Sequence, residues 1–125
     1  MRFIAIFTVI TLSLTSAALA APRDVLVMET GNKSTAVVLS AAPTSSAQFA
    51  ALELQYHLEK ITGEEPPIVS EPDVPDVMVR IAVGDTALGK SLGFPVDALQ
   101  PWEFLVAERG GTIVLAGGDD PITGS

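Results

Sequence analysis

Residues 44–63, TSSAQFAALELQYHLEKITG, decide the fold because they predict one long helix with both a start and a stop signal. Ser45 or Ser46 can cap the start, since a hydroxyl at that position accepts hydrogen bonds from the free amides of the first turn. Gly63 favours the left-handed conformation that ends many helices, and the two prolines that follow at close range prevent the helix from resuming. We therefore expect a single helix that begins and ends within this stretch.

The apolar positions of this helix share one face. They follow one another at steps of four, three, four and three residues, as Ala47, Ala51, Leu54, Leu58 and Ile61. This spacing is that of a helix packed on one side against a core. A short β-rich run at residues 68–69 follows the glycine and the prolines. A helix that leads into a strand through a tight turn is typical of a layered α/β domain.

Strands are predicted on both sides of the long helix. Residues 24–30 and 35–40 are expected to form a hairpin, because a Gly-Asn-Lys turn separates two β-branched, apolar runs. Residues 77–83, VMVRIAV, are expected to form a central strand, because near-continuous apolar runs are buried on both faces of a sheet. Arg80 in this run indicates that one face is only partly covered or that the strand lies near an edge. Residues 85–91 predict a short capped helix after that strand.

A second hairpin is predicted near the end of the chain. Residues 102–108 alternate in polarity, and residues 112–116 return after a Gly-Gly turn. The alternation puts Trp102, Phe104 and Val106 on the same side, and we expect the aromatic residues to pack in the core. The alternative is an exposed platform, because aromatic faces suit the C–H surfaces of sugars. Trp102 and Phe104 are therefore the candidate carbohydrate contacts.

The first twenty residues have the pattern of a signal peptide. Arg2 is followed by an apolar run at residues 3–14 and by the small-x-small sequence Ala18-Leu19-Ala20. The run is shorter than the roughly 20 residues of a spanning helix, so a membrane anchor is less favoured. We expect cleavage after Ala20, one domain over residues 21–125, and a secreted or periplasmic location.

The charge and the absence of cysteine exclude several classes of binding partner. The 125 residues include 15 acidic and 7 basic side chains, with a net charge of −8 and no cysteine. An acidic surface repels phosphate backbones, and no basic cluster is present to hold an anionic membrane. We therefore expect no nucleic-acid partner, no membrane contact after signal cleavage, and no disulfide or thiolate metal site.

The sequence contains no complete motif for catalysis, phosphate binding or metal binding. His57 is the only histidine, so neither a two-histidine zinc motif nor a histidine-rich catalytic centre is predicted. The carboxylate groups in loops are expected to be solvated: Glu64, Glu65, Glu71, Asp73, Asp76, Asp119 and Asp120. The Gly84-Asp85-Thr86 turn is expected to be structural, because it lacks the lysine and further glycines of a phosphate loop. We expect no catalytic, cofactor-binding or metal-binding residue in this chain.

Several segments together resemble a known family. They are ALELQYHLEKITG (51–63), PIV (67–69), IAVGDT (81–86), Phe104 in the following strand, and IVLAGG (113–118). In this order they resemble the small N-terminal α/β domain that precedes the catalytic barrel in α-glucuronidases and β-N-acetylhexosaminidases. The similarity is greatest to the α-glucuronidase type and covers nearly all of residues 25–125.

The resemblance implies a fold and a role. The fold is an α/β (α+β) domain with a small mixed sheet and helices mainly on one face, of the zincin-like hexosaminidase domain-2 type. In the family a helix follows the Gly-Gly segment. Because this chain stops at Gly124-Ser125, after a loop typical of a helix start, we expect a C-terminally truncated domain whose final helix is missing.

The implied role is that of a non-catalytic accessory domain. Such a domain packs on the catalytic barrel of an exported glycoside hydrolase for polysaccharide or xylan breakdown, and it carries no catalytic residue or cofactor. This chain alone is expected to have no hydrolase activity. The alternative is a free-standing exported module that binds a carbohydrate or a protein, with Trp102 and Phe104 on its binding surface.

Overall fold

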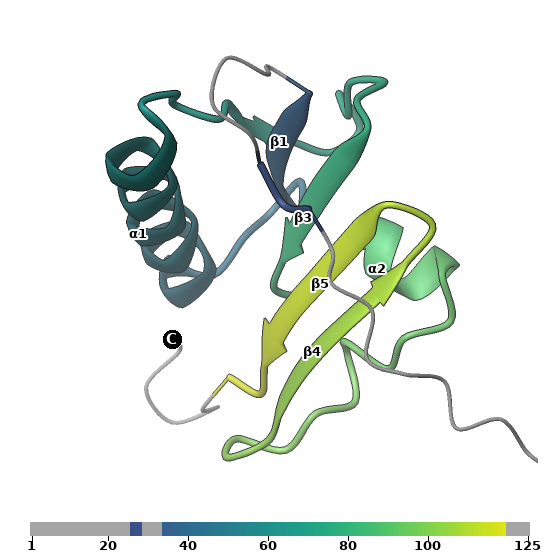
Figure 1. Cartoon of the computed structure of the whole chain (residues 1–125). Coiled ribbons are helices and arrows are strands. Elements are labelled where there is room, and N and C mark those ends of the chain that lie inside the picture. Colours follow the sequence, from purple (N-terminus) through teal and green to yellow (C-terminus); the bar gives the residue numbers. More distant parts are fainter. Residues whose placement is uncertain (1–25, 29–33, 120–125) are drawn as a thin grey trace, which may run out of the picture.

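The computed structural model describes residues 26–28 and 34–119 of the chain (Figure 1). The predicted signal peptide, residues 1–20, lies outside the described residues. The elements follow in the order β1 (Thr35–Leu39), α1 (Ser45–Thr62), β2 (Ile68–Ser70), β3 (Val79–Val83), α2 (Ala87–Ser91), β4 (Phe104–Arg109) and β5 (Thr112–Gly117).

The five strands form one mixed sheet in the order β2-β1-β3-β5-β4. Strands β2, β1, β3 and β5 run parallel to one another, and β4 is antiparallel to β5. The predicted mixed α/β architecture is confirmed, and β3 is the central strand as expected. Arg80 does not mark an edge of the sheet. Its guanidinium reaches Asp76 at 3.6 Å, close to the point where the chain enters β3.

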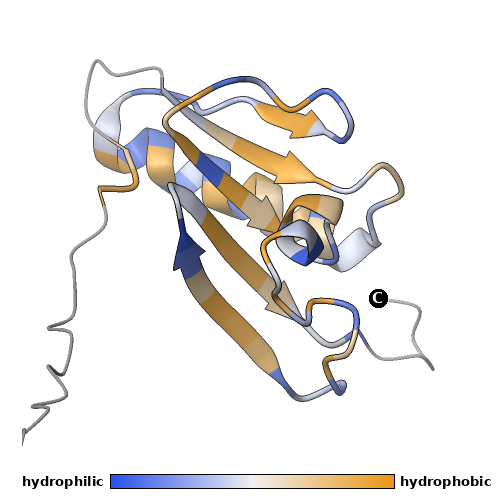
Figure 2. Ribbon diagram, turned by 90° about the vertical axis from the view of Figure 1, so that its right-hand side faces the viewer, coloured by the Kyte–Doolittle hydropathy of each residue, from blue (hydrophilic) through white to orange (hydrophobic). Residues whose placement is uncertain are grey.

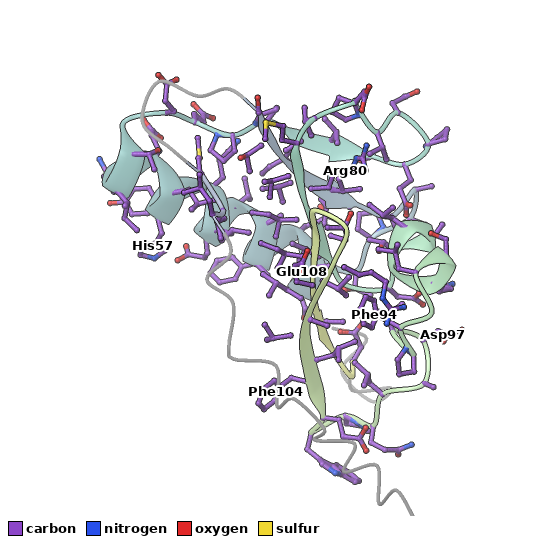
Figure 3. The ribbon with its side chains drawn as sticks, turned by 45° about the vertical axis from the view of Figure 1, so that its right-hand side comes forward. His57, Arg80, Phe94, Asp97, Phe104 and Glu108 are labelled. Atoms are coloured by element: carbon purple, nitrogen blue, oxygen red, sulfur yellow. The ribbon has the colours of Figure 1, made fainter. Side chains whose placement is uncertain are left out.

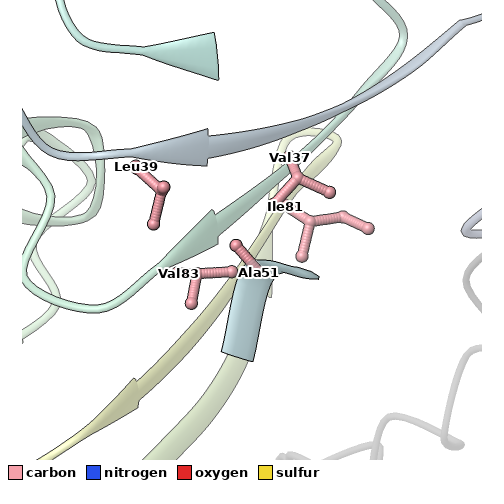
Figure 4. Close-up of a cluster of buried hydrophobic side chains, with 5 residues drawn as sticks. All are labelled: Val37, Leu39, Ala51, Ile81 and Val83. Atoms are coloured by element: carbon pink, nitrogen blue, oxygen red, sulfur yellow. The ribbon is translucent and has the colours of Figure 1, made fainter. Parts of the chain in front are cut away.

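Both faces of the sheet are covered at the central strand β3. Ile81 belongs to a buried cluster under α1, and the adjacent Ala82 belongs to a second cluster on the opposite face, with α2 and the loop after it. Figure 4 shows the first cluster, in which Ala51 of α1 meets side chains of β1 and β3. The two helices therefore lie on opposite faces (Figure 1). The expectation of helices mainly on one face is wrong, because a central strand apolar on both sides needs cover on both.

The ends of α1 are set by Thr44 and Gly63. Thr44 is the N-cap, with extended backbone angles of φ −67° and ψ 161°, and the Ala47 amide donates to its hydroxyl at 3.1 Å. The prediction of Ser45 or Ser46 is wrong by one or two residues, because Ser45 is already helical. Gly63 has a φ of 77°, so the predicted left-handed stop is confirmed.

The apolar stripe of α1 is largely as predicted. Ala51 is fully buried, and three other members, Ala47, Leu54 and Leu58, pack against the same cluster. Ile61 is the exception, with an exposed fraction of 79%. In the last turn the inward position passes to Thr62, which is buried and donates its hydroxyl proton to the Leu58 carbonyl at 2.7 Å.

The predicted N-terminal hairpin is wrong. Strand β1 pairs with β2 on one side and with β3 on the other, so neither edge is free for the residues before it. Residues 26–28 are not a strand, although the Val27 carbonyl accepts a hydrogen bond from the Thr35 hydroxyl at 2.8 Å. The rest of the predicted strand and its turn lie outside the described residues.

The predicted C-terminal hairpin is confirmed. Strand β4 pairs with β5 in a register that sets Phe104 opposite Gly117 and Arg109 opposite Thr112. The strand begins at Phe104 rather than at Trp102. Gly111, in the turn, has a φ of 83°, and a β-carbon there would lie 2.6 Å from the Met78 carbonyl oxygen. Only glycine fits this turn without displacement.

Candidate functional site

The face of the sheet that α1 covers is only half covered. The helix packs chiefly on β1, β2 and β3. On the same face, the β4 register pairs Val106 with Leu115, a residue that borders the cluster under α1. Val106 nevertheless has an exposed fraction of 67%, and Phe104, two residues before it, one of 80%. An apolar strip along β4 and β5 is therefore open beside the helix.

This strip forms the floor of a groove of about 590 Å³ between α1 and the β4–β5 hairpin. One wall comes from Ala47, Ala50 and Leu54 of α1. The floor and the opposite side come mainly from Phe104 and Val106, with Leu115 of β5. Figure 2 shows that β4 is hydrophobic over most of its length and hydrophilic at its end. We call this space the groove. The six residues named here form most of its apolar lining.

One end of the groove lies at the carboxyl ends of β3 and β5. Gly84, Gly118 and Asp119 follow these strands and line this end, beside Thr44 at the start of α1. Among the described residues, Asp119 is the only charged one that lines the groove. Asp120, its predicted partner in a carboxylate pair, lies outside the described residues.

No basic residue of the described part of the chain lines the groove. The lysines and arginines in residues 26–28 and 34–119 each have a partner elsewhere. Arg80 pairs with Asp76 at 3.6 Å and Lys90 with Asp85 at 3.1 Å. Arg109 donates to the Leu92 carbonyl and lies over the Phe94 ring, and Lys60 lies over the Tyr56 ring. The lining of the groove is therefore mostly apolar, and the charge that it carries is negative.

Trp102 and Phe104 are both exposed, each with an exposed fraction of 80%, so the expectation that they pack in the core is wrong. The physical reason is the position of α1, which does not extend over β4. Phe104 lines the groove and projects away from the strand (Figure 3). Trp102 lies just before β4, next to Pro101, which lines the groove.

His57 is exposed on α1, as expected of a surface histidine (Figure 3). Its Nε2 lies 3.6 Å from a carboxylate oxygen of Glu53, one helical turn earlier. Among the described residues, no group of three or more histidine, aspartate or glutamate side chains is arranged to hold a metal ion.

The expectation that Glu71 is a solvated loop acid is wrong. Its two carboxylate oxygens accept hydrogen bonds from the amides of Ala87 and Leu88, at 2.8 and 2.9 Å. The buried Thr86 hydroxyl accepts from Gly89 at 3.0 Å. The start of α2 is therefore already satisfied by side chains of this chain, and the turn at residues 84–86 is structural, as predicted. No sequence signal connects Glu71 with a helix sixteen residues later.

Lys90 has a raised pKa, because Asp85 accepts a hydrogen bond from its ammonium group and adds the attraction of its charge. The ammonium group and its partner are both about half exposed. Exposed ion pairs of this kind are surface features and contribute little to stability. The raised pKa therefore does not indicate an acid or a base poised for catalysis.

The groove itself was not predicted from the sequence. A signal was present, because β4 is apolar on both of its faces, with Leu105 and Ala107 on one and Phe104 and Val106 on the other. A strand of this kind needs cover on both faces. Sequence spacing alone did not indicate which of these faces α1 would leave open.

Two further findings concern membrane helices in the described residues and the comparisons with known proteins. No helix in the described residues combines the length and the apolar character that crossing a membrane requires. In comparisons with known proteins, no family model, no curated protein and no solved structure matches this chain.

Proposed function

We propose that this chain is a non-catalytic accessory domain of an exported, α-glucuronidase-like glycoside hydrolase, and that it packs on the catalytic barrel through the groove. The family resemblance of the helix and strand segments supports the parent activity and the zincin-like, hexosaminidase domain-2 type of fold. The signal pattern of residues 1–20 supports export to the periplasm or the medium.

The main structural support for this proposal is the open groove. Monomeric soluble proteins rarely leave a large contiguous apolar surface exposed, and such surfaces mark docking sites. Phe104 and Val106 are the most exposed large apolar residues of the groove lining. Both lie on β4, a regular strand that is paired with β5. A rigid apolar face of this kind suits a permanent contact with another domain better than it suits chemistry on a substrate.

The test is a hydrolase assay on the purified chain. Aldouronic acids and aryl hexosaminides are incubated with the protein, and an active α-glucuronidase serves as the positive control. We expect no turnover above the blank, because the catalytic carboxylates of the family belong to the barrel. Turnover that copurifies with the chain and rises in proportion to its concentration would refute the accessory role.

A second candidate function is carbohydrate binding by a free-standing exported module. It is favoured by the exposure of Trp102 and Phe104, since exposed aromatic rings stack on sugars. Calorimetry with xylan and chitin oligosaccharides separates the two candidates. Saturable binding that is lost in Trp102→Ala and retained in Phe49→Ala, an exposed aromatic position on α1, supports the module. Absence of binding supports the accessory domain.

A further inference from the structure

We propose that the chain binds a small organic carboxylate in a pocket around Arg80, on the face of the sheet opposite the groove. The Arg80 guanidinium holds the carboxylate, and apolar side chains hold the body of the ligand, which is an aromatic ring or a short alkyl chain. We call this space the Arg80 pocket. The inference goes beyond the proposed function, because it concerns neither catalysis nor the contact with the barrel.

The Arg80 pocket lies between α2 and the loop after β2, and its volume is about 490 Å³. Side chains two residues apart on a strand share a face, so Arg80 lies on the same face of β3 as Ala82. Ala82 belongs to the cluster against which Leu88 of α2 packs. The groove uses the other face of the sheet, so a domain docked in the groove leaves the Arg80 pocket accessible.

The pocket has the size and the composition of a small-molecule site. Such sites enclose about 300–1,000 Å³ and combine mostly apolar walls with a few polar groups. The apolar walls of this pocket are Pro72, Val74, Ala87 and Leu88. They belong to two elements, the loop and α2, so the apolar body of a ligand between them contacts both.

Arg80 is the polar group of the pocket that is available to a ligand. Its side chain is 28% exposed, and its Nε donates to the Pro75 carbonyl at a long 3.4 Å. Its Nη2 lies 3.6 Å from a carboxylate oxygen of Asp76, and within residues 26–28 and 34–119 neither terminal nitrogen of the guanidinium makes a hydrogen bond. Asp76 is fully exposed, and exposed ion pairs are weak, so a ligand carboxylate can replace it.

The other polar side chains of the lining are already engaged. Both carboxylate oxygens of Glu71 accept from amides of α2, at 2.8 and 2.9 Å, and the Ser91 hydroxyl donates to a backbone carbonyl at 2.7 Å. The free guanidinium is a planar fork that matches a carboxylate through two parallel hydrogen bonds. A phosphate is less suitable, because Arg80 is the only basic residue that lines the pocket in the described part of the chain. Its second negative charge would be left unbalanced beside Glu71.

The test titrates hydrocinnamate into the isotope-labelled chain and follows the backbone amide signals by NMR. Two matched ligands separate the contributions: hydrocinnamide has the same ring without the charge, and acetate has the charge without the ring. We expect saturable shifts at Ala87 and Leu88, because both line the pocket. Each matched ligand should bind about tenfold more weakly, since each lacks one of the two contacts.

Two pairs of variants test the role of the guanidinium. Arg80→Met keeps the apolar stem and should weaken binding about tenfold, whereas Lys60→Met removes the same charge on α1, outside the pocket, and should have little effect. Asp76→Asn removes the competing carboxylate and should strengthen binding. Asp73→Asn is its control, since Asp73 is an exposed acid of the same loop that forms no ion pair within the described residues. A gain in affinity cannot come from a loss of folding, so the second pair remains decisive if Arg80→Met is unstable.

Any of four results overturns the inference. They are no saturable shift with hydrocinnamate, binding of hydrocinnamide or acetate that equals that of hydrocinnamate, equal losses in Arg80→Met and Lys60→Met, and a gain in Asp76→Asn no larger than that in Asp73→Asn. Hydrolase turnover would refute the proposed function without affecting the binding of the carboxylate, so the two failures are distinguishable.

Discussion

Val106 and Val114 offer a direct measure of whether the groove is open in solution. They lie on the paired strands β4 and β5 but on opposite faces of the sheet. Val114 is fully buried in a cluster with Ala82 of β3 and Val96 of the loop after α2, whereas Val106 is 67% exposed in the groove. Replacing each by alanine removes the same two methyl groups. The β-propensity of valine reflects side-chain packing and burial at each strand position, so the difference between the two losses of stability reports burial.

The expected magnitudes follow from the exposed fractions. Two buried methyl groups are worth about 1.6 kcal/mol in transfer free energy, and the cavity left in a packed core adds to this. Val114→Ala should therefore lower the free energy of unfolding by about 2–3 kcal/mol. Val106 is only about one-third buried, so the same substitution should cost about 0.5 kcal/mol. For a domain of this size, 1 kcal/mol corresponds to about 4–8 °C in melting temperature.

Urea unfolding followed by far-ultraviolet circular dichroism gives both values, with melting curves as a check. The clear separation of the two variants is the expected result. Equal losses would mean that the face of Val106 is filled in the free chain. The groove would then not be available to a partner, and the docking role would lose its basis.

Three further outcomes are expected. Glu71→Ala should lower the free energy of unfolding by about 1–2 kcal/mol, because two amides of α2 lose their acceptors; urea titration measures it, and an unchanged midpoint would contradict the cap. Gly111→Ala should destabilise more than Gly63→Ala, because both have a positive φ but only at Gly111 would a β-carbon meet a backbone oxygen; thermal melts rank them, and the reverse order would be incompatible with this geometry. Lys90→Met should destabilise slightly near neutral pH and not at strongly alkaline pH. The partner carboxylate raises the lysine pKa above its ordinary value of 10.5, so the stabilisation is present below that value and disappears as the pH rises through the raised pKa. A difference in stability that persists unchanged at strongly alkaline pH would contradict the ion pair.

The sequence contains enough information for the long helix and for the central strand. The stop at Gly63 and most of the stripe of α1 follow from local backbone chemistry and helical spacing. The apolar run of β3 similarly predicts burial on both faces. These features depend on residues close together in the chain, which is why they could be predicted.

The first hairpin could not be excluded in the same way. Residues 24–30 and 35–40 have suitable composition and a suitable turn between them. The error arises because β2 and β3, which come later in the chain, occupy both edges of β1. Strand pairing is a competition between local and distant partners, and the distant partners are invisible to a local pattern.

The site was missed for a related reason. Alternation in β4 correctly puts Phe104 and Val106 on one face. Whether that face is covered depends on where α1 lies across the sheet, and the spacing of the helix residues does not specify this. The role of Glu71 was hidden too, because its hydrogen bonds connect a loop with a helix sixteen residues away.

Strand β4 closes one side of the sheet, and its outer edge has no neighbour among the described strands. Edges of this kind invite the addition of foreign strands and, in concentrated solution, aggregation. The uncharged run in β4 is only four residues long, Phe104 to Ala107, and Glu103 and Glu108 stand immediately before and after it. These two acids act as gatekeepers, since any strand added to this edge would lie beside both carboxylates. The domain can thus keep the apolar face of the groove exposed while its edge resists polymerisation.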